Sequence, residues 1–172
     1  MVEPKNYVCL FKIILVMKKT VVFPGSFDPI TRGHESIIKR AIPLFDKIII
    51  AVGENVEKKY LFTSEQRINW LKKVFANNSS VNVEGFKGLT VDFCKKVNAN
   101  YILRGLRTSS DFEFERSIGQ INKKLSPEIE TIFMLTEPEY TALNSSIVRD
   151  IFLNGGNVKD FIPDGINLTI KT

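Results

Sequence analysis

The chain alternates between short runs rich in β-branched residues and longer amphipathic segments, and this alternation constrains its fold more than any other feature. Short apolar runs between turn signals favour strands. Four of the five runs are apolar on both faces, which is typical of parallel strands covered by helices on both sides. The predicted strands are 20–23, 47–52, 81–86, 101–104 and 130–135.

The segments between these strands carry apolar residues at helical spacing. One segment places Ile37, Ile38 and Ala41 on one face, and another follows Thr63 and Gln66, which have the spacing of a capping box. Three further helices are predicted, over about 90–97, over about 110–125, and from about 145 to the glycine pair at 155–156.

Five such alternations with short connections predict a single-domain α/β fold. We expect a doubly wound, Rossmann-like, five-stranded parallel sheet with helices on both faces. Ligands of such sheets bind at the carboxyl ends of the strands, so the residues that follow each strand are the candidates for a functional site.

Composition narrows the chemistry further. The chain has 24 Lys plus Arg against 19 Asp plus Glu, and this net charge of +5 indicates a site that handles anions. One histidine, His34, and two cysteines, Cys9 and Cys94, are too few for a Cys/His zinc cluster or a disulfide framework. Neither cysteine belongs to a CxxC pair, so we expect a reduced, cytoplasmic protein in which Cys94 is an inert apolar thiol.

Residues 1–16 do not follow this pattern. Their apolar run resembles the centre of a signal peptide, but Lys12 interrupts it and no small-x-small cleavage site follows. The run is also far shorter than the roughly 20 apolar residues of a spanning helix, so we expect no membrane association. Met17 is typical of a natural start. We expect residues 1–16 to be an extension, whether a misplaced start, a disordered tail or an extra β segment, and the folded domain to be 17–172.

The residues directly after the first predicted strand, 24–34 (PGSFDPITRGH), form the clearest candidate site. Gly25 allows the backbone to approach a ligand closely, and Ser26 offers a hydroxyl and an N–H at the strand end. His34 lies at the start of the next helix, where free N–H groups and the helix dipole favour phosphate. An imidazole there can donate to an anionic oxygen; the alternative is an ordinary surface histidine.

Residues 26–34 resemble the (H/T)xGH signature of the nucleotidylyltransferase superfamily, in the form found in the bacterial phosphopantetheine adenylyltransferase family. TxGH alone is a weak pattern. The likeness nevertheless extends over nearly all of 18–165 and keeps its order, which makes it specific. Its further elements are Lys58-Lys59, Phe62-Thr63, RGLR at 104–107, DFEFE at 111–115 and NSSIVR at 144–149.

The resemblance implies an enzyme of coenzyme A biosynthesis that transfers AMP from ATP to 4′-phosphopantetheine, giving dephospho-coenzyme A and pyrophosphate. The attacking acceptor phosphate is already anionic at neutral pH, so no general base is needed to make the nucleophile. The in-line step requires alignment of two polyanions and neutralisation of charge on the α-phosphate and the leaving pyrophosphate. One imidazole and a few Lys and Arg residues can supply this.

Catalytic and acceptor-binding roles follow from the same resemblance. His34 is expected to stabilise the transition state, and Lys58 to hold phosphate near the reaction centre as a second catalytic group. The acceptor is expected to contact Ser26, Lys58, Thr90 and Arg104. Judged from the residues alone, Lys58 could instead be a solvated surface lysine, and Thr90 could be the N-cap of its helix.

An ATP site is implied as well. Within it, Arg107 could alternatively form a structural ion pair with Asp111 or Glu113, and Glu115 could be one more charge on an exposed helix face. The residues expected to contact ATP are Ser26, Phe27, His34, Gly105, Leu106, Arg107, Glu115, Tyr140, Thr141, Ala142, Leu143, Asn144, Ser145 and Ser146.

Residues 140–146 lead into the fifth predicted helix, where hydroxyl and N–H groups could bind the β- and γ-phosphates of ATP. Asn144 replaces the first of three serines usual in the family, which puts one phosphate contact in question. Tyr140 stands where an aromatic residue often packs near adenine, and the alternative is an exposed aromatic side chain.

Other functions lack their motifs. The chain has no GxxxxGK[ST] loop, no GxGxxG and no HExxH. Mg²⁺ is expected to accompany ATP, held by phosphate oxygens and water, with no metal site formed directly by protein carboxylates. The remaining alternatives are a related adenylyl- or cytidylyltransferase with another phosphate acceptor, a small basic nucleic-acid-binding module, and a class I aminoacyl-tRNA synthetase fragment, for which a KMSKS-type segment is missing.

The expected partners are therefore small molecules. They are ATP, 4′-phosphopantetheine and dephospho-coenzyme A, with coenzyme A as a feedback inhibitor, and neither a nucleic acid nor a membrane. The family typically forms a homohexamer, so the resemblance implies that assembly too, although no residue in the sequence demonstrates it.

Overall fold

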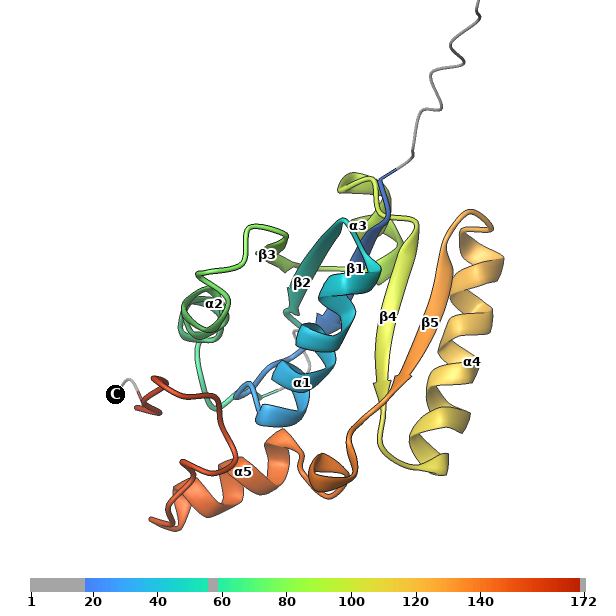
Figure 1. Cartoon of the computed structure of the whole chain (residues 1–172). Coiled ribbons are helices and arrows are strands. Elements are labelled where there is room, and N and C mark those ends of the chain that lie inside the picture. The colour runs from blue at the N-terminus through green and yellow to red at the C-terminus, as the bar shows by residue number, and fades with distance from the viewer. Residues whose placement is uncertain (1–17, 56–58, 171–172) are drawn as a thin grey trace, which may run out of the picture.

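A five-stranded, all-parallel sheet forms the centre of the molecule in a computed structural model that describes residues 18–55 and 59–170 (Figure 1). The strand order is β3-β2-β1-β4-β5. This arrangement confirms the predicted α/β sheet. The strands are β1 (Thr20–Gly25), β2 (Lys47–Gly53), β3 (Val81–Phe86), β4 (Tyr101–Leu106) and β5 (Glu130–Leu135). The prediction for residues 1–16 falls outside the described residues, as does Lys58.

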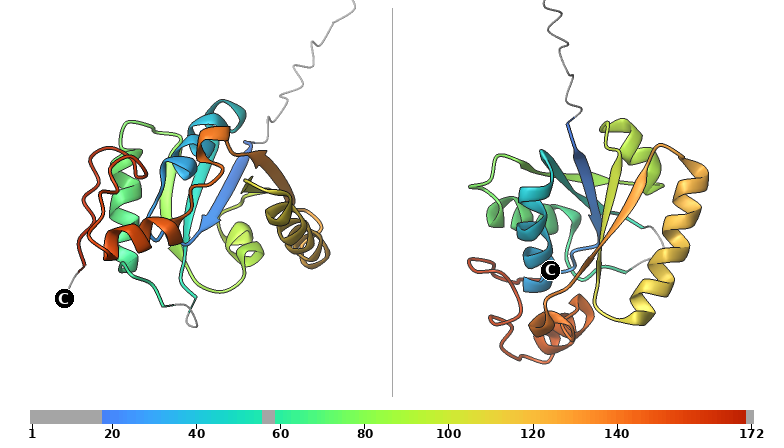
Figure 2. Two further views of the ribbon diagram at one scale, coloured as in Figure 1. Left: turned by 90° about the horizontal axis from the view of Figure 1, so that it is seen from below. Right: turned by 45° about the vertical axis from the view of Figure 1, so that its right-hand side comes forward.

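Helices cover both faces of the sheet, as expected for a doubly wound fold (Figure 2). On one face lie α1 (Arg32–Ala41) and α2 (Ser64–Val74), and on the other lie α3 (Thr90–Lys96) and α4 (Ser109–Leu125). The last helix, α5 (Ser145–Leu153), runs beneath the carboxyl ends of the strands (Figure 1). Two short 3-10 helices, Ile42–Leu44 and Pro138–Tyr140, complete the regular elements.

The order of the strands explains where a ligand can bind. From β1 the chain winds outward through β2 to β3, and it then crosses back over the sheet to place β4 on the other side of β1. The direction of winding reverses between β1 and β4, so the loops after these two strands leave in opposite directions and open a crevice.

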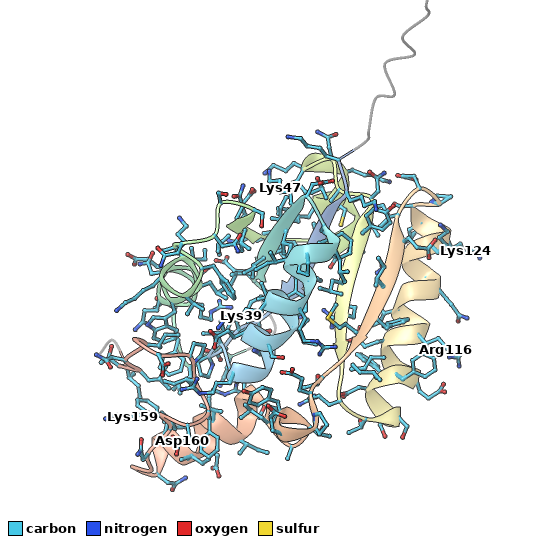
Figure 3. All side chains as sticks on the ribbon, in the orientation of Figure 1. Lys39, Lys47, Arg116, Lys124, Lys159 and Asp160 are labelled. Atoms are coloured by element: carbon cyan, nitrogen blue, oxygen red, sulfur yellow. The ribbon has the colours of Figure 1, made fainter. Side chains whose placement is uncertain are left out.

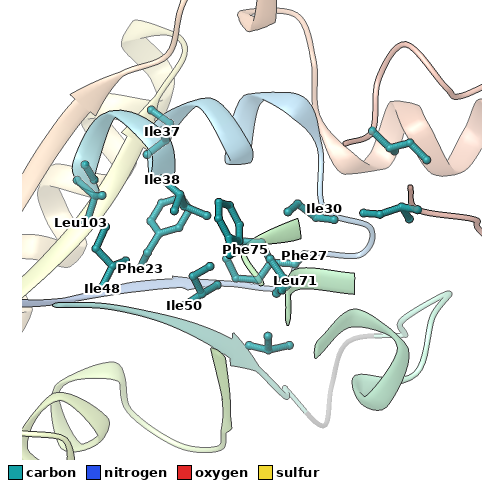
Figure 4. Close-up of a cluster of buried hydrophobic side chains, with 14 of the residues drawn as sticks. Phe23, Phe27, Ile30, Ile37, Ile38, Ile48, Ile50, Leu71, Phe75 and Leu103 are labelled. Carbon is teal, nitrogen blue, oxygen red and sulfur yellow. The ribbon is translucent and has the colours of Figure 1, made fainter. Parts of the chain in front are cut away.

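The larger core lies between the sheet and α1 and α2 (Figure 4). In the close-up, Phe23 from β1 and Ile48 and Ile50 from β2 face Ile38 of α1 and Leu71 of α2. Side chains alternate between the two faces of a strand, so Val22 and Ile49 lie in the second core, beneath α3. In this second core, burial raises the pKa of the Cys94 thiol to about 12, in agreement with the expected inert thiol.

Three strands extend beyond their predicted ends, β2 by one residue to Gly53. β1 continues to Gly25 and β4 to Leu106, because the parallel pairing persists, with Gly25 opposite Val52 and Leu106 opposite Leu135. The glycines that interrupt the apolar pattern therefore lie inside the sheet. At Gly105 a Cβ atom would lie 3.3 Å from Ile37 Cγ1, so the absent side chain lets α1 pack closely on β4.

The helix caps confirm one expectation and correct another. Thr63 and Gln66 form the predicted capping box at the start of α2. At α3 the N-cap residue is Leu89, with no side-chain capping hydrogen bond, and Thr90 is the first helical residue. The N-cap alternative for Thr90 is therefore wrong: its hydroxyl is one position too late to bond the free N–H groups of the first turn.

Candidate active site

A cavity opens at the carboxyl edge of the sheet, at the crevice between β1 and β4. The end of β1, the end of β4, the first turn of α1, the first turns of α4 and the segment before α5 all contribute to it. Ten of the sequence-predicted site residues line this cavity: Ser26, Phe27, His34, Arg104, Gly105, Arg107, Glu115, Leu143, Asn144 and Ser145.

His34 is held in a defined orientation by the cap of its own helix. The N–H of Thr31 donates to His34 Nδ1 at 3.1 Å, and the Thr31 hydroxyl lies 3.0 Å from the same nitrogen. Thr31 Oγ1 in turn accepts from the His34 N–H, which completes a capping box in which histidine takes the place of the usual Glu or Gln. A backbone N–H can only donate, so Nδ1 must be the acceptor and Nε2 must carry the proton.

The surroundings of His34 also keep its ring uncharged. Burial, together with the positive charges of Arg107 and Arg104, lowers the pKa of His34 from 6.5 to about 4. The ring packs edge-on against Phe27, with 5.2 Å between the ring centroids. At neutral pH the residue is thus a neutral imidazole whose Nε2–H can donate a hydrogen bond.

Arg104, near the end of β4, is tied to α4 and to β1. Its Nε donates to Glu115 Oε2 at 2.7 Å, its Nη2 donates to Glu115 Oε1, and its Nη1 donates to the carbonyl of Pro24 at 2.7 Å. This two-point pairing fixes the plane of the guanidinium group. Glu115 is only 8% exposed, so the alternative of a charge on an exposed helix face is wrong.

Arg107 forms the structural ion pair that the sequence left open, and its partner is Asp111. Arg107 Nε lies 3.0 Å from Asp111 Oδ2, and its Nη1 donates to the carbonyl of Leu143 at 3.5 Å. Glu113 pairs with Arg116 instead. Because Arg107 also lines the cavity, the ion pair orients a cation at the site.

The segment before α5 reaches the cavity only in part. Asn144 is the N-cap of α5 and accepts from the Ile147 N–H through its side-chain oxygen, while Ser145 Oγ donates to the carbonyl of Pro29 at 2.8 Å. Tyr140 is half-buried rather than exposed, and it packs at the start of α1, where a Cβ atom on Gly33 would lie 3.4 Å from Tyr140 Cβ. Tyr140, Thr141, Ala142 and Ser146 do not line the cavity.

The remaining predicted residues lie apart from this cavity. Leu106 is buried in the sheet. Thr90 lines an adjoining cavity on the other face of the sheet, between α3 and α4. This second cavity shares Pro24, Arg104 and Glu115 with the first, so the two meet at the Arg104–Glu115 pair.

Several groups that shape the site went unrecognised in the sequence. Thr31 and Thr136 line the cavity, and Asp28, which is buried, fixes the loop after β1. Of these, Thr31 carried a usable signal, since it stands three residues before His34 at the spacing of a capping box. For the others nothing in the sequence indicates proximity, which arises from the packing of distant segments.

A metal ion finds no ready-made site in the described part of the chain. No group of three or more His, Cys, Asp or Glu side chains there is placed to hold one. The two carboxylates of the main cavity, Asp111 and Glu115, are each paired with an arginine. Across the same residues, no helix is long and apolar enough to span a bilayer.

Comparison with known proteins agrees with this geometry at the level of class. The cytidylyltransferase-like family model matches residues 22–151, which include both the His34 loop and the end of β4. Among solved structures, a bifunctional NMN adenylyltransferase/ADP ribose pyrophosphatase from Francisella tularensis superposes with a TM-score of 0.63 at 22% identity, over 85% of this chain and 45% of that one. This likeness supports the fold.

Closer relatives carry one shared name. Phosphopantetheine adenylyltransferase from Flavobacterium psychrophilum is 51% identical over 87% of this chain and 99% of its own length. The protein of the same name from Christiangramia forsetii is 54% identical over 85% of this chain and 96% of its own. The chain belongs to the phosphopantetheine adenylyltransferase family, within the cytidylyltransferase-like class.

Proposed function

We propose that the chain transfers AMP from ATP to 4′-phosphopantetheine, forming dephospho-coenzyme A and pyrophosphate in coenzyme A biosynthesis. The observation that carries this proposal is the neutral, Nε2-protonated His34 beside Arg104 and Arg107 in one cavity at the crevice of a doubly wound sheet. Membership in the family supports the choice of substrates.

The proposed step needs donors and cations rather than a base. An acceptor phosphate oxygen attacks the α-phosphorus of ATP, a new P–O bond forms, and the bond to pyrophosphate breaks with its electron pair leaving on pyrophosphate. His34 Nε2–H would donate to an α-phosphate oxygen as charge develops there. Arg107, fixed by Asp111, would lie toward the phosphates, with the N-terminus of α5 as a further anion-binding end.

The acceptor would enter from the Arg104 side. Arg104 joins the two cavities, so a phosphate bound by its guanidinium at the junction leaves the second cavity for the pantetheine arm. That cavity combines apolar and hydrogen-bonding groups, with Ile118 beside Thr90 and Asn122. This mixture fits a chain that carries amide groups and methylenes. Lys58 would complete the phosphate contacts.

Mg²⁺ would enter as a complex with ATP. When bound, it would neutralise charge on the phosphate oxygens. The donors present fit this weak role, because both carboxylates of the cavity already pair with Arg104 or Arg107. The protein would therefore hold the phosphates, and the phosphates would hold the ion.

Assembly and regulation extend the proposal. We place the enzyme in the cytoplasm as a homohexamer, inhibited by coenzyme A, which shares the phosphopantetheine arm of the substrate. Support for self-association comes from α4, where Phe114, Ile121 and Leu125 are 67%, 59% and 52% exposed on one stripe of the helix. Apolar side chains that recur at this spacing on an outer helix favour a protein partner over solvent.

A nucleic-acid-binding module would need its positive charge on one continuous face. The labelled Lys39, Lys47, Arg116, Lys124 and Lys159 in Figure 3 are spread around the molecule, on α1, β2, α4 and the segment after α5. This distribution supports a small-molecule site, where a few arginines inside one cavity do the binding.

Pyrophosphate release tests the proposed reaction. The untagged chain is incubated with ATP, Mg²⁺ and, in separate reactions, 4′-phosphopantetheine, nicotinamide mononucleotide or glycerol 3-phosphate. We expect pyrophosphate only with 4′-phosphopantetheine. Absence of product with 4′-phosphopantetheine would refute the proposal.

The role of His34 is tested with the His34→Ala variant in the same assay. We expect this variant to lower kcat severely while ATP affinity changes by a modest factor, because the His34 donor acts in the transition state.

A further inference from the structure

Arg67, on α2, is a fully buried arginine whose side chain lies beneath the active-site loop. It is 1% exposed, and its guanidinium donates to three backbone carbonyls. Nη1 donates to the Ser26 carbonyl at 2.6 Å and to the Gly53 carbonyl at 3.4 Å, and Nε donates to the Phe62 carbonyl at 3.2 Å. The ring of Tyr60 covers the group, with 4.2 Å between the ring centroid and Arg67 Cζ.

The carbonyl bound most closely by Arg67 precedes a strained residue. Phe27 has φ 50°, in the left-handed region that side chains other than glycine rarely adopt. Such a conformation is unfavourable and persists only where the surroundings enforce it. Phe27 is also 2% exposed, and its ring packs against His34. The strained peptide thus sets both the direction of Ser26 and the support of the His34 ring.

Asp28 extends the same restraint to the other side of the loop. Its carboxylate accepts from the N–H groups of Leu61 and Phe62 at 3.0 and 2.9 Å, and its carbonyl accepts from Arg149 Nη1 at 2.5 Å. The loop after β1 is therefore held from α2, from the segment before α2 and from α5.

Stability alone explains Arg67 poorly. Burial lowers the pKa of its guanidinium, and the negative charges of Asp28 and Glu54 offset this only in part. Among the described residues no carboxylate lies within 4.0 Å of the Arg67 nitrogens, so the buried charge has no direct ion-pair partner. An apolar side chain of similar volume would avoid the cost of burying the charge. What an apolar side chain cannot do is donate to carbonyls of three segments at once, which the planar fork of arginine allows.

We propose that Arg67 is a positioning residue for the transfer reaction. Arg67 binds the Ser26 carbonyl together with the Gly53 carbonyl at the end of β2 and the Phe62 carbonyl before α2. In this way it fixes the peptide plane between Ser26 and Phe27 and keeps Phe27 in its left-handed conformation. Ser26 and His34, which line the same cavity, are then held in fixed positions relative to each other. This proposal rests on the proposed function, because the aligned groups are those of the transfer step.

The neighbouring residue provides a matched control. Gln66 is 8% exposed on the same helix, and its Nε2 donates to the Thr169 carbonyl at 2.7 Å, far from the active-site loop in sequence. Arg67→Met and Gln66→Met each remove one buried polar side chain with its backbone partners. They differ in whether the lost partner belongs to the site.

The experiment measures kcat, both KM values and thermal unfolding for the two variants, assayed well below their unfolding temperatures. We expect Arg67→Met to lower kcat by about 10- to 100-fold, the range for small misalignments of reacting groups, and to raise KM for 4′-phosphopantetheine. Gln66→Met should stay within about twofold of wild type in kcat at a comparable loss of stability. Equal kcat values in the two folded variants would overturn the proposal.

Arg67→Lys serves if the methionine variant does not fold. A lysine keeps the charge but replaces the fork with a single point of donation. We expect kcat of Arg67→Lys to stay below about a tenth of the wild-type value, at near wild-type unfolding temperature. Full recovery would show that charge and volume suffice, and would overturn the positioning role. The proposed function fails separately, since in that case the wild-type chain itself would release no pyrophosphate.

Discussion

At the scale of single residues, the chemistry of the site depends on which nitrogen of His34 carries a proton. The Thr31 N–H selects the Nε2–H form, and burial, together with the charges of Arg107 and Arg104, disfavours a second proton on the ring. With its pKa lowered to about 4, the ring stays neutral around neutral pH, so its contribution to catalysis does not change with pH there. This arrangement suits a reaction whose nucleophile is already ionised.

Titration of His34 tests this assignment directly, because the chain has one histidine and its imidazole signals are unambiguous. We expect NMR of the untagged protein to show no histidine titration near pH 6.5 and a pKa of about 4. A pKa near 6.5 would contradict the neutral-donor assignment.

The same shift affects stability. Below pH 6.5 His34 binds a proton in the unfolded chain, whereas in the folded chain it stays unprotonated until the pH falls to about 4. The free energy of unfolding should therefore fall as the pH drops from about 6.5 to about 4. Denaturant titrations of wild type and His34→Asn across this range should show the steeper decline in wild type.

Glu115 pairs with an adjacent arginine, and this pairing changes the role expected for its carboxylate. The family resemblance implies a contact with ATP, whereas in the fold both of its oxygens accept from Arg104. We expect Glu115→Gln to raise KM for 4′-phosphopantetheine by about threefold to tenfold, from the loss of one charge-assisted bond, with a smaller effect on ATP. Steady-state kinetics with each substrate varied would measure this.

Glu113→Gln is the control for that variant. Glu113 is a neighbouring carboxylate on α4, and it pairs with Arg116 at the surface. Its loss should leave both KM values unchanged. If Glu115→Gln instead raises KM for ATP alone, the carboxylate serves the nucleotide rather than Arg104.

At the scale of elements, α4 has an inner face that packs on the sheet and an outer face that carries exposed apolar side chains. One side packs on β4 and β5, where Phe112 meets the ring of Phe133, and the absent side chain of Gly119 leaves room for Thr131. Glu115 points from this inner side to Arg104. The outer side carries the apolar stripe of Phe114, Ile121 and Leu125. The helix thus links the active site to the surface proposed for self-association.

Substitution on the outer stripe tests that surface. Ile121→Glu places a charge among apolar side chains, and we expect the particle mass from light scattering to fall below that of wild type. Gln120→Glu adds the same charge on a polar side of the helix and should leave the mass unchanged. A wild-type chain that is monomeric at micromolar concentration would contradict the proposed assembly.

At the scale of the whole molecule, the strand order brings the functional segments together. Ser26 and Arg104 are far apart in sequence, yet β1 and β4 are neighbours, so their carboxyl ends border one crevice. The alternation of strands and helices predicted this class of sheet, all five strands and their approximate bounds. The hydrophobic period carries that information locally, since each element must bury one or both faces.

The sequence by itself determined the α/β class, the capping box at Thr63, and the loop from Ser26 to His34, because these depend on residues close together in the chain. Only the tertiary structure decided which cavity Thr90 lines, that Glu115 is buried against Arg104, and that Arg67 lies beneath the Ser26 carbonyl. Burial and pairing between distant segments arise from packing and desolvation, and a local pattern carries no record of which segments will meet.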